Sequence, residues 1–294
     1  MNQPLFQGSA VALVTPFHQG KVDIQALRRL VNRQIEGGTA AIVSCGTTGE
    51  PSTLSERERE LVIAETVKAA DGRVPVICGT GSNCTQAVLE NERRYRDLGC
   101  AAQLVVTPYY NKTTQEGLYA HFMAVAEGTE LPIILYNVPS RTGLDISAAT
   151  LARLAKSGRF IALKESSYAV PGILEKLAVM EGKMALYSGN DDMVFPLLSL
   201  GARGVISVVS NVAPALMSDM VSAWFEGDAA RSRALQLQSL PLVRALFHEV
   251  SPIPCKYAMA RLGLCEGELR LPLIDAGADT RAMMDEALRG LSLL

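Results

Sequence analysis

Short apolar runs rich in β-branched residues recur along the chain at a nearly constant spacing, and helix-like stretches separate them. The strand-like runs occupy residues 9–17, 39–50, 74–81, 101–110, 131–140, 160–167, 184–191 and 204–211. The helix-like stretches occupy residues 23–37, 55–70, 85–98, 115–128, 147–157, 170–181 and 192–200. Because a helical crossover joins strands that run parallel, eight such units predict an α/β fold whose strands close into a (β/α)8 TIM barrel.

The pattern changes after the eighth strand-like run. Residues 213–227 have the pattern of an eighth barrel helix, and residues 228–294 have helical patterns almost throughout. We therefore expect a catalytic barrel domain over residues 1–227 and a C-terminal helical domain over residues 228–294, which packs on the barrel or supports an oligomer. An open doubly wound sheet is the alternative, but it would carry a phosphate-binding glycine motif after the first strand, and residues 15–23 have none.

Composition excludes several classes of protein. The 294 residues include 28 basic and 30 acidic side chains, and no basic cluster offers a surface for nucleic acid. No apolar run approaches the roughly 18 residues that a membrane span needs, and the first ten residues lack the pattern of a signal peptide. The six cysteines contain no C-x-x-C pair. We expect a reduced, cytoplasmic protein with neither nucleic-acid nor membrane partners.

Polar side chains gather where the predicted strands end, which in a TIM barrel is the edge that holds the active site. These strand exits carry Thr15, Thr47–Thr48, Thr80, Tyr109–Tyr110, Tyr136–Asn137, Lys164 and Ser188–Asn190. Lys164 alone among the eight lysines ends an apolar strand, whereas Lys176 and three others fall on stretches that we expect to be solvated. A lysine in that position can extend to water, but a partly desolvated amine is also a nucleophile that forms Schiff bases.

A Schiff-base site also needs groups that bind carboxylates and move protons. Thr47 and Thr48 lie in a glycine-rich turn whose backbone N–H groups can hold a carboxylate. Tyr110 and Tyr136 can pass protons, and Arg141 can bind a second carboxylate through two hydrogen bonds. Each has an ordinary structural alternative as a turn, packing or surface residue.

Metal and cofactor chemistry has no support in the sequence. The three histidines are scattered, and no metal-binding motif is present. The pair Asp191–Asp192 could be imagined as a Mg²⁺ site, but we expect it to complement the dipole of the helix that it opens. We expect no metal and no cofactor.

At this point several motifs resemble the dihydrodipicolinate synthase family of pyruvate-dependent class I aldolases. They are "GTTGE" (46–50), "TPYYN" (107–111), "YNVPSRTG" (136–143), "ALKES" (162–166), "YSGND" (187–191), "SPIPCKYA" (251–258) and "LRLPL" (269–273). The resemblance covers essentially the whole chain. It implies a lyase of lysine and diaminopimelate biosynthesis that joins pyruvate to L-aspartate 4-semialdehyde through a lysine Schiff base, without a metal or organic cofactor.

The resemblance also implies roles for single residues. Lys164 would form the Schiff base, while Tyr136, Thr47 and Tyr110 would relay protons. Tyr110 would act in the site of a neighbouring subunit, which implies a homo-oligomer, and the resemblance implies a dimer of dimers. The substrate-binding residues that it implies are Thr48, Arg141, Ile206 and Gly189.

Some members of this family bind lysine as an inhibitor, and the resemblance places a possible effector site at Ser52, Glu56, Asn83 and Tyr109. Sensitive members have a histidine at the position of Glu56 and a glutamate at that of Ala87. Because the second difference removes a carboxylate that could bind an ammonium group, we predict weak or absent inhibition by lysine.

Three alternatives stay open at this stage. Another pyruvate-dependent lyase of the same superfamily could cleave a sialic acid or a 2-keto-3-deoxy sugar acid, although Arg141 favours the synthase. A barrel that binds a keto acid without catalysis would not need the combination of lysine, relay and carboxylate site. A phosphate-binding barrel would need a glycine-rich site after the seventh or eighth strand.

Overall fold

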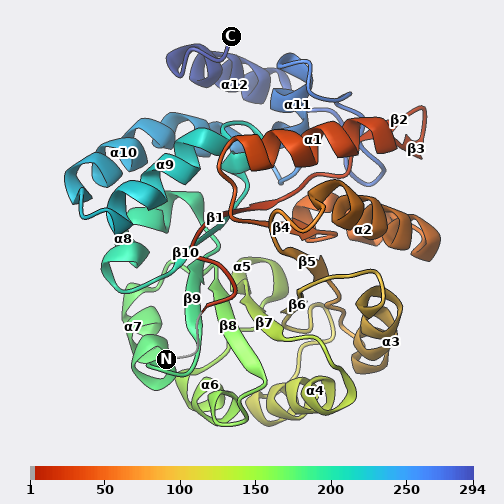
Figure 1. Ribbon diagram of the computed structural model, residues 1–294, viewed down its shortest axis with the longest axis vertical. Helices are drawn as coiled ribbons and strands as arrows, with labels where there is room; N and C mark the ends of the chain where they lie inside the picture. The colour runs from red at the N-terminus through yellow and green to blue at the C-terminus, as the bar shows by residue number, and fades with distance from the viewer. Residues whose placement is uncertain (1–3) are drawn as a thin grey trace.

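Residues 4–294 are described by the computed structural model, and within them eight parallel strands close into a barrel (Figure 1). The strands are β1 (Gly8–Ala12), β4 (Ala41–Ser44), β5 (Val76–Gly79), β6 (Ala102–Val106), β7 (Ile133–Asn137), β8 (Phe160–Glu165), β9 (Ala185–Ser188) and β10 (Gly204–Ser207). Closure occurs at β1, which pairs with β4 on one side and with β10 on the other. The predicted TIM barrel is confirmed.

Helices surround the barrel as a ring (Figure 1). They are α1 (Ile24–Glu36), α2 (Glu56–Ala70), α3 (Thr85–Arg96), α4 (Gln115–Gly128), α6 (Ala148–Ala155), α7 (Val170–Met180), α8 (Val194–Ser199) and α9 (Pro214–Phe225). Local sequence fixes several helix starts. Ser55 accepts a hydrogen bond from the backbone N–H of Glu58, whose side chain bonds back to the backbone of Ser55, a capping box that begins α2.

The strands have two apolar faces because successive side chains point to opposite sides. On β8, Ala162 belongs to the cluster inside the barrel and Leu163 to the cluster between strands and helices. The alternation therefore directs Lys164 into the barrel and Glu165 outward. At the opposite end, the ring of Phe6 stacks on that of Tyr187 at 4.2 Å and helps fill the barrel.

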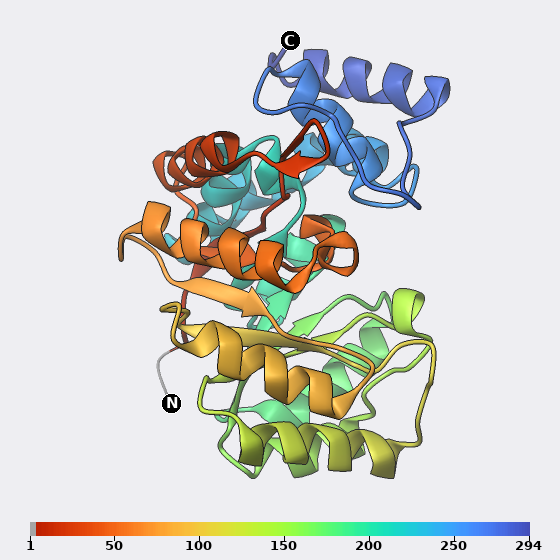
Figure 2. The same ribbon diagram turned by 90° about the vertical axis from the view of Figure 1, so that its right-hand side faces the viewer.

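The C-terminal region adds three helices, α10 (Ala229–Leu246), α11 (Ile253–Arg261) and α12 (Ala278–Gly290). They gather at one end of the molecule beside α1 and the small hairpin of β2 (Phe17–His18) and β3 (Lys21–Val22) (Figure 2). No helix within residues 4–294 combines the length and the apolar character that crossing a bilayer requires.

The expectation that residues 228–294 are almost entirely helical is wrong for residues 262–277, which form a long connection without a helix. Gly263, Gly267 and Pro272 explain this because they disfavour helix. The connection is nevertheless fixed in place: the Arg270 guanidinium donates to the carboxylate of Glu58 on α2 at 2.5 and 2.9 Å. The division into two domains at residue 227 stays a prediction.

Candidate active site

A cavity of about 510 Å³ opens at the C-terminal ends of the barrel strands. Six residues predicted from the sequence line it: Thr47, Thr48, Tyr136, Arg141, Lys164 and Gly189. They come from four different strand exits, so the closure of the barrel brings together residues that are up to 142 positions apart in the chain.

Lys164 lines this cavity and is only 6% exposed. Tyr136 on β7 is its direct partner in the strand register, and the Lys164 Nζ atom lies 4.1 Å from the centre of the Tyr136 ring. An ammonium group over an aromatic face is attracted to it. The two residues that the sequence assigned to nucleophile and proton relay are therefore in contact.

The glycine at 189 keeps the space beside Lys164 open. A Cβ atom at that position would lie 3.1 Å from Lys164 Cε and only 1.9 Å from Ser166 Oγ, so the Ser166 hydroxyl would have to move away. The Gly189 N–H donates to the carbonyl of Glu165 at 2.7 Å, and this bond fixes the close approach of the two loops. This close approach explains why a glycine suits position 189. The substrate-binding role of Gly189 stays a prediction.

The turn after β4 presents the two threonines. It forms a short 3₁₀ helix, Thr47–Gly49, between two non-glycine residues in the left-handed region, Cys45 (φ 55°) and Glu50 (φ 52°). The Thr15 hydroxyl donates to the carbonyl of Gly49 at 2.7 Å, so the exit of β1 fixes this turn. Such strained conformations persist only where surrounding contacts hold them.

Arg141 lies at the mouth of the cavity on the short helix α5 (Pro139–Thr142), which directly follows β7. Pro139 at the first helical position suits the start of this helix. One terminal nitrogen, Nη2, donates to the carbonyl of Ser251 at 3.2 Å. This bond orients the guanidinium, whose remaining donors can meet an anion at the cavity mouth.

Two predicted residues lie outside the cavity. The side chain of Ile206 is fully buried inside the barrel, and Val208, two residues further along, lines the cavity instead. Tyr110 is 93% exposed with φ 67° and does not line the cavity. The substrate-binding role of Ile206 and the relay role of Tyr110 stay predictions.

The expectation that Lys176 is solvated is wrong: it is 3% exposed. Its Nζ atom lies 2.9 Å from Glu165 Oε2 and 2.7 Å from Asp145 Oδ1, and Asn137 Nδ2 donates to both carboxylates. The reason is the alternation of β7 and β8, which turns Asn137 and Glu165 outward to face α7. The sequence contained a signal for this network, because a polar residue directly follows each predicted site residue: Asn137 follows Tyr136, and Glu165 follows Lys164. This buried network connects the strand ends that carry Tyr136 and Lys164.

Asp191 also departs from expectation. Its carboxylate accepts hydrogen bonds from the backbone N–H groups of Val208 and Val209 at 3.0 and 3.1 Å, rather than complementing the helix that it opens. Burial raises the pKa of Asp191, and these bonds oppose the rise. Among residues 4–294 there is no cluster of three histidine, cysteine or acidic side chains that could hold a metal ion.

The connection between α10 and α11 forms a wall of the cavity that the sequence did not predict. Residues 247–251 line it, and a chain of hydrogen bonds fixes this connection to α12. Thr280 Oγ1 lies 2.9 Å from His248 Nδ1 and donates to Glu249 Oε1 at 2.6 Å. Across the cavity, Tyr168 has its pKa raised to about 12 by burial and by the nearby carboxylate of Asp192.

Comparison with known proteins decides the family. The model of the "Dihydrodipicolinate synthetase family" matches residues 5–290. The chain belongs to this family. It is 45% identical over 290 residues to the 4-hydroxy-tetrahydrodipicolinate synthase of Trichlorobacter lovleyi, covering 99% of this chain and 100% of that protein. The enzyme of the same name from Clostridium novyi is 46% identical over 284 residues, covering 97% and 96%.

Solved structures agree with this assignment. The dihydrodipicolinate synthase of Thermotoga maritima superposes with a TM-score of 0.97 at 41% identity, covering 99% of this chain and 100% of that one. The chloride-inhibited enzyme of Acinetobacter baumannii in complex with pyruvate has a TM-score of 0.95 at 44% identity, covering 98% and 99%. The family resemblance inferred from the motifs is confirmed.

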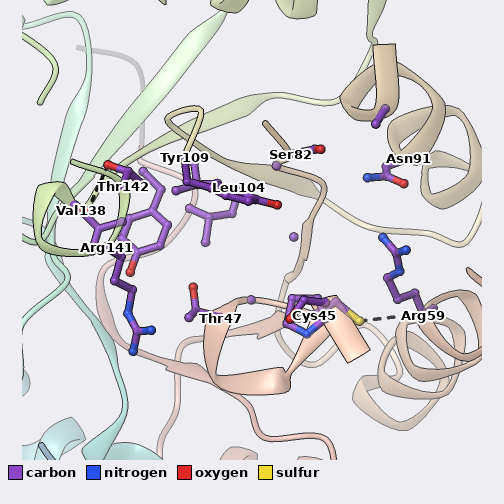
Figure 3. Close-up of a pocket in the computed structure, with 18 of the residues that line it drawn as sticks. Cys45, Thr47, Arg59, Ser82, Asn91, Leu104, Tyr109, Val138, Arg141 and Thr142 are labelled. Carbon is purple, nitrogen blue, oxygen red and sulfur yellow. Dashed lines mark hydrogen bonds between the residues drawn. The ribbon is translucent and has the colours of Figure 1, made fainter. Parts of the chain in front are cut away.

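A second cavity, of about 600 Å³, extends from the mouth of the first cavity into the groove between α2 and α3 (Figure 3). It touches three of the four residues at which family resemblance predicted an effector site, Ser52, Glu56 and Tyr109. The fourth, Asn83, does not line it, and its carbonyl instead accepts a hydrogen bond from Asn111 Nδ2 at 3.0 Å.

Charge in this groove is partly neutralised. The Arg94 guanidinium is paired with the carboxylate of Glu56, and this hydrogen bond lowers the pKa of Glu56. In Figure 3, Arg59 and Asn91 lie on the side of the cavity opposite Arg141. Among the solved relatives, the dihydrodipicolinate synthase of Cyanidioschyzon merolae, 36% identical with a TM-score of 0.96, was determined with lysine bound.

Proposed function

We propose that the protein condenses pyruvate with L-aspartate 4-semialdehyde to 4-hydroxy-tetrahydrodipicolinate, through a Schiff base on Lys164. The observation that carries this proposal is the position of Lys164, a buried lysine at the end of a barrel strand in the cavity that also holds Thr48, Tyr136 and Arg141. Membership of the family and the names of relatives near 45% identity support the same reaction.

The chemistry begins with pyruvate. Lys164 Nζ attacks the ketone carbon, water leaves, and the resulting iminium makes the methyl protons of pyruvate acidic. Thr48 and the backbone N–H groups of its turn would hold the pyruvate carboxylate. Tyr136, in contact with the amine, would carry protons during formation of the iminium and the enamine.

The second half of the reaction uses the aldehyde. The enamine carbon attacks the aldehyde carbon, and the amine of the second substrate then displaces Lys164 by transimination as the ring closes. Arg141 at the cavity mouth would bind the carboxylate of this substrate. No metal or organic cofactor enters these steps.

Completion of the proton relay requires a second copy of the chain. Thr47 lines the catalytic cavity, whereas Tyr110 is almost fully exposed and lies outside it. We therefore propose that Tyr110 enters the site of a neighbouring subunit in a homo-oligomer, arranged as a dimer of dimers. The six cysteines are free thiols, which supports the proposal of a cytoplasmic location.

The proposal is tested by trapping the imine. The protein is incubated with pyruvate and borohydride, its intact mass is measured, and the modified peptide is mapped. We expect a reduced pyruvyl adduct on Lys164 in the wild type and none in Lys164→Ala, with Lys183→Ala as a control because Lys183 is exposed and precedes its strand. A folded wild-type protein that forms no adduct contradicts the proposal. Adduct formation without turnover of the aldehyde contradicts the choice of second substrate.

A further inference from the structure

Ser166 lines the catalytic cavity directly after β8, and nothing in the mechanism above uses it. Its side chain is 4% exposed, and within residues 4–294 its Oγ atom is buried without a hydrogen-bond partner. Its backbone is well fixed, because its N–H donates to the carbonyl of Asn137 at 2.8 Å. Buried hydroxyls nearly always have a partner, so this one needs an explanation.

Other buried hydroxyls at the strand ends do have partners. The Ser188 hydroxyl donates to the carbonyl of Asn190 at 2.8 Å. The Thr80 hydroxyl donates to Gln103 Oε1 at 2.7 Å. The unpartnered state is therefore particular to Ser166 rather than general to this edge of the barrel.

The position of the hydroxyl points to Lys164. The Cβ that Gly189 lacks would contact both Ser166 Oγ and Lys164 Cε, so these two atoms face the same small space. Ser166 follows Lys164 by two residues, which places both side chains on the inner side of the barrel wall. A group bound to Lys164 Nζ would enter the space in which the hydroxyl has no protein partner.

We infer that Ser166 is a further catalytic residue, whose hydroxyl hydrogen-bonds the ketone oxygen of pyruvate while that oxygen leaves as water. The inference rests on the proposed function. Lys164 Nζ attacks the ketone carbon through its lone pair, as the free amine. One proton from this nitrogen and one delivered through Tyr136 end on the former ketone oxygen, the C–O bond breaks with its electron pair on oxygen, and the products are an iminium and water.

Negative charge develops on the oxygen before its protonation is complete. A donor placed where charge develops accelerates such a step, and it is most effective where water does not compete for it. The Ser166 hydroxyl satisfies both conditions and remains protonated throughout. Its lack of a partner in the free protein is also informative, because removing an unsatisfied buried hydroxyl does not weaken the fold.

The test is the rate of imine formation in Ser166→Ala, measured by rapid quenching with borohydride after mixing with pyruvate. We expect the pyruvyl adduct on Lys164 to form about 10- to 100-fold more slowly than in the wild type, as for loss of one buried donor to a charged group. The unfolding temperature should be equal to or higher than that of the wild type, which separates catalysis from a loss of structure.

The neighbouring serine provides a matched control. Ser167 does not line the cavity, so adduct formation in Ser167→Ala should stay within about twofold of the wild type. Wild-type rates in Ser166→Ala overturn the assignment of Ser166 and leave the proposed function intact. Absence of any adduct in the wild type overturns the proposed function, and the inference with it.

Discussion

Lys256 Nζ on α11 lies 2.5 Å from Glu50 Oε1, and both side chains are buried. Lys256 also donates to the carbonyl of Glu268 at 2.8 Å and lies 3.9 Å from the centre of the Phe17 ring. Glu50 ends the strained turn that presents Thr47 and Thr48. The C-terminal region therefore holds the turn of Thr47 and Thr48 in place through a buried ion pair, besides forming one wall of the cavity.

We predict that Lys256→Met lowers the free energy of unfolding by about 3 to 5 kcal/mol, because it leaves the Glu50 carboxylate buried without its partner. The double variant Lys256→Met/Glu50→Gln should recover much of this loss, since it removes the unpaired charge. Urea unfolding of the wild type, both single variants and the double variant measures the coupling. Strictly additive losses would show that the pair does not act as a unit.

We predict that Lys164→Ala lowers turnover by at least about a thousandfold, because within residues 4–294 no other lysine lines this cavity to form the covalent intermediate. The measurement is a steady-state assay of product formation from pyruvate and aspartate 4-semialdehyde. Lys183→Ala is expected to keep wild-type turnover. Normal turnover in Lys164→Ala would refute its role as the nucleophile.

We predict that Arg141→Met raises the KM for aspartate 4-semialdehyde by about 10- to 100-fold, the effect of losing a charge-assisted hydrogen bond. Formation of the pyruvyl adduct should be nearly unchanged, since Arg141 is assigned to the second carboxylate. Steady-state kinetics with each substrate varied separately, together with imine trapping, distinguish an effect on the aldehyde substrate from an effect on pyruvate. An equal loss of pyruvate binding would move Arg141 to the first half of the reaction.

Stability in acid should depend on the pair of Arg270 and Glu58. The hydrogen bond from Arg270 lowers the pKa of Glu58 to about 2, from an ordinary value of 4.5. The folded protein releases this proton more readily than the unfolded chain. The contribution of the pair to the free energy of unfolding is therefore complete above about pH 5 and is lost as the pH falls towards 2. When the free energy of unfolding is measured from pH 6 to pH 2, the difference between the wild type and Arg270→Met should become smaller in acid. As a control, Arg289→Met removes an exposed arginine and should differ little from the wild type in free energy of unfolding at any pH. A difference for Arg270→Met that does not change with pH would contradict this account.

The order of the elements and the position of Lys164 follow from the sequence for a physical reason. Apolar residues recur with a different period in a strand and in a helix, so the order of the elements can be predicted. A strand that is buried on both faces is apolar throughout, so its first charged residue indicates where it ends. Lys164 is such a residue, and in the structure it is the last residue but one of β8 and 6% exposed. Tyr136 could be placed near it because parallel strands expose their exits at one edge.

The features that the sequence did not predict depend on contacts with other parts of the chain. Lys176 has the spacing of a solvated helical residue, and only the outward direction of Glu165 explains its burial. Ser251 and His248 reach the cavity because α10 and α11 pack against the barrel, which no local pattern encodes. The unpartnered hydroxyl of Ser166 is likewise visible only in three dimensions.

The groove between α2 and α3 allows a prediction about inhibition by lysine. At its wall, the carboxylate of Glu56 is already paired with Arg94, and Ala87 has no charge to offer an ammonium group. The remaining carboxylate there, Glu90, accepts a hydrogen bond from Gln86 at 3.1 Å. We therefore expect weak or absent inhibition when L-lysine is titrated into the assay.

The corresponding gain-of-function variant is Glu56→His/Ala87→Glu, which introduces a carboxylate on α3 at the wall of the groove. Inhibition by lysine should strengthen in this variant by about tenfold or more, as for one new charge-assisted contact. Ala87→Gln is the matched control, because it has similar size and no charge. If the wild type proves strongly inhibited, the prediction is wrong, and loss of that inhibition in Glu90→Gln would identify the carboxylate that binds the ammonium group instead.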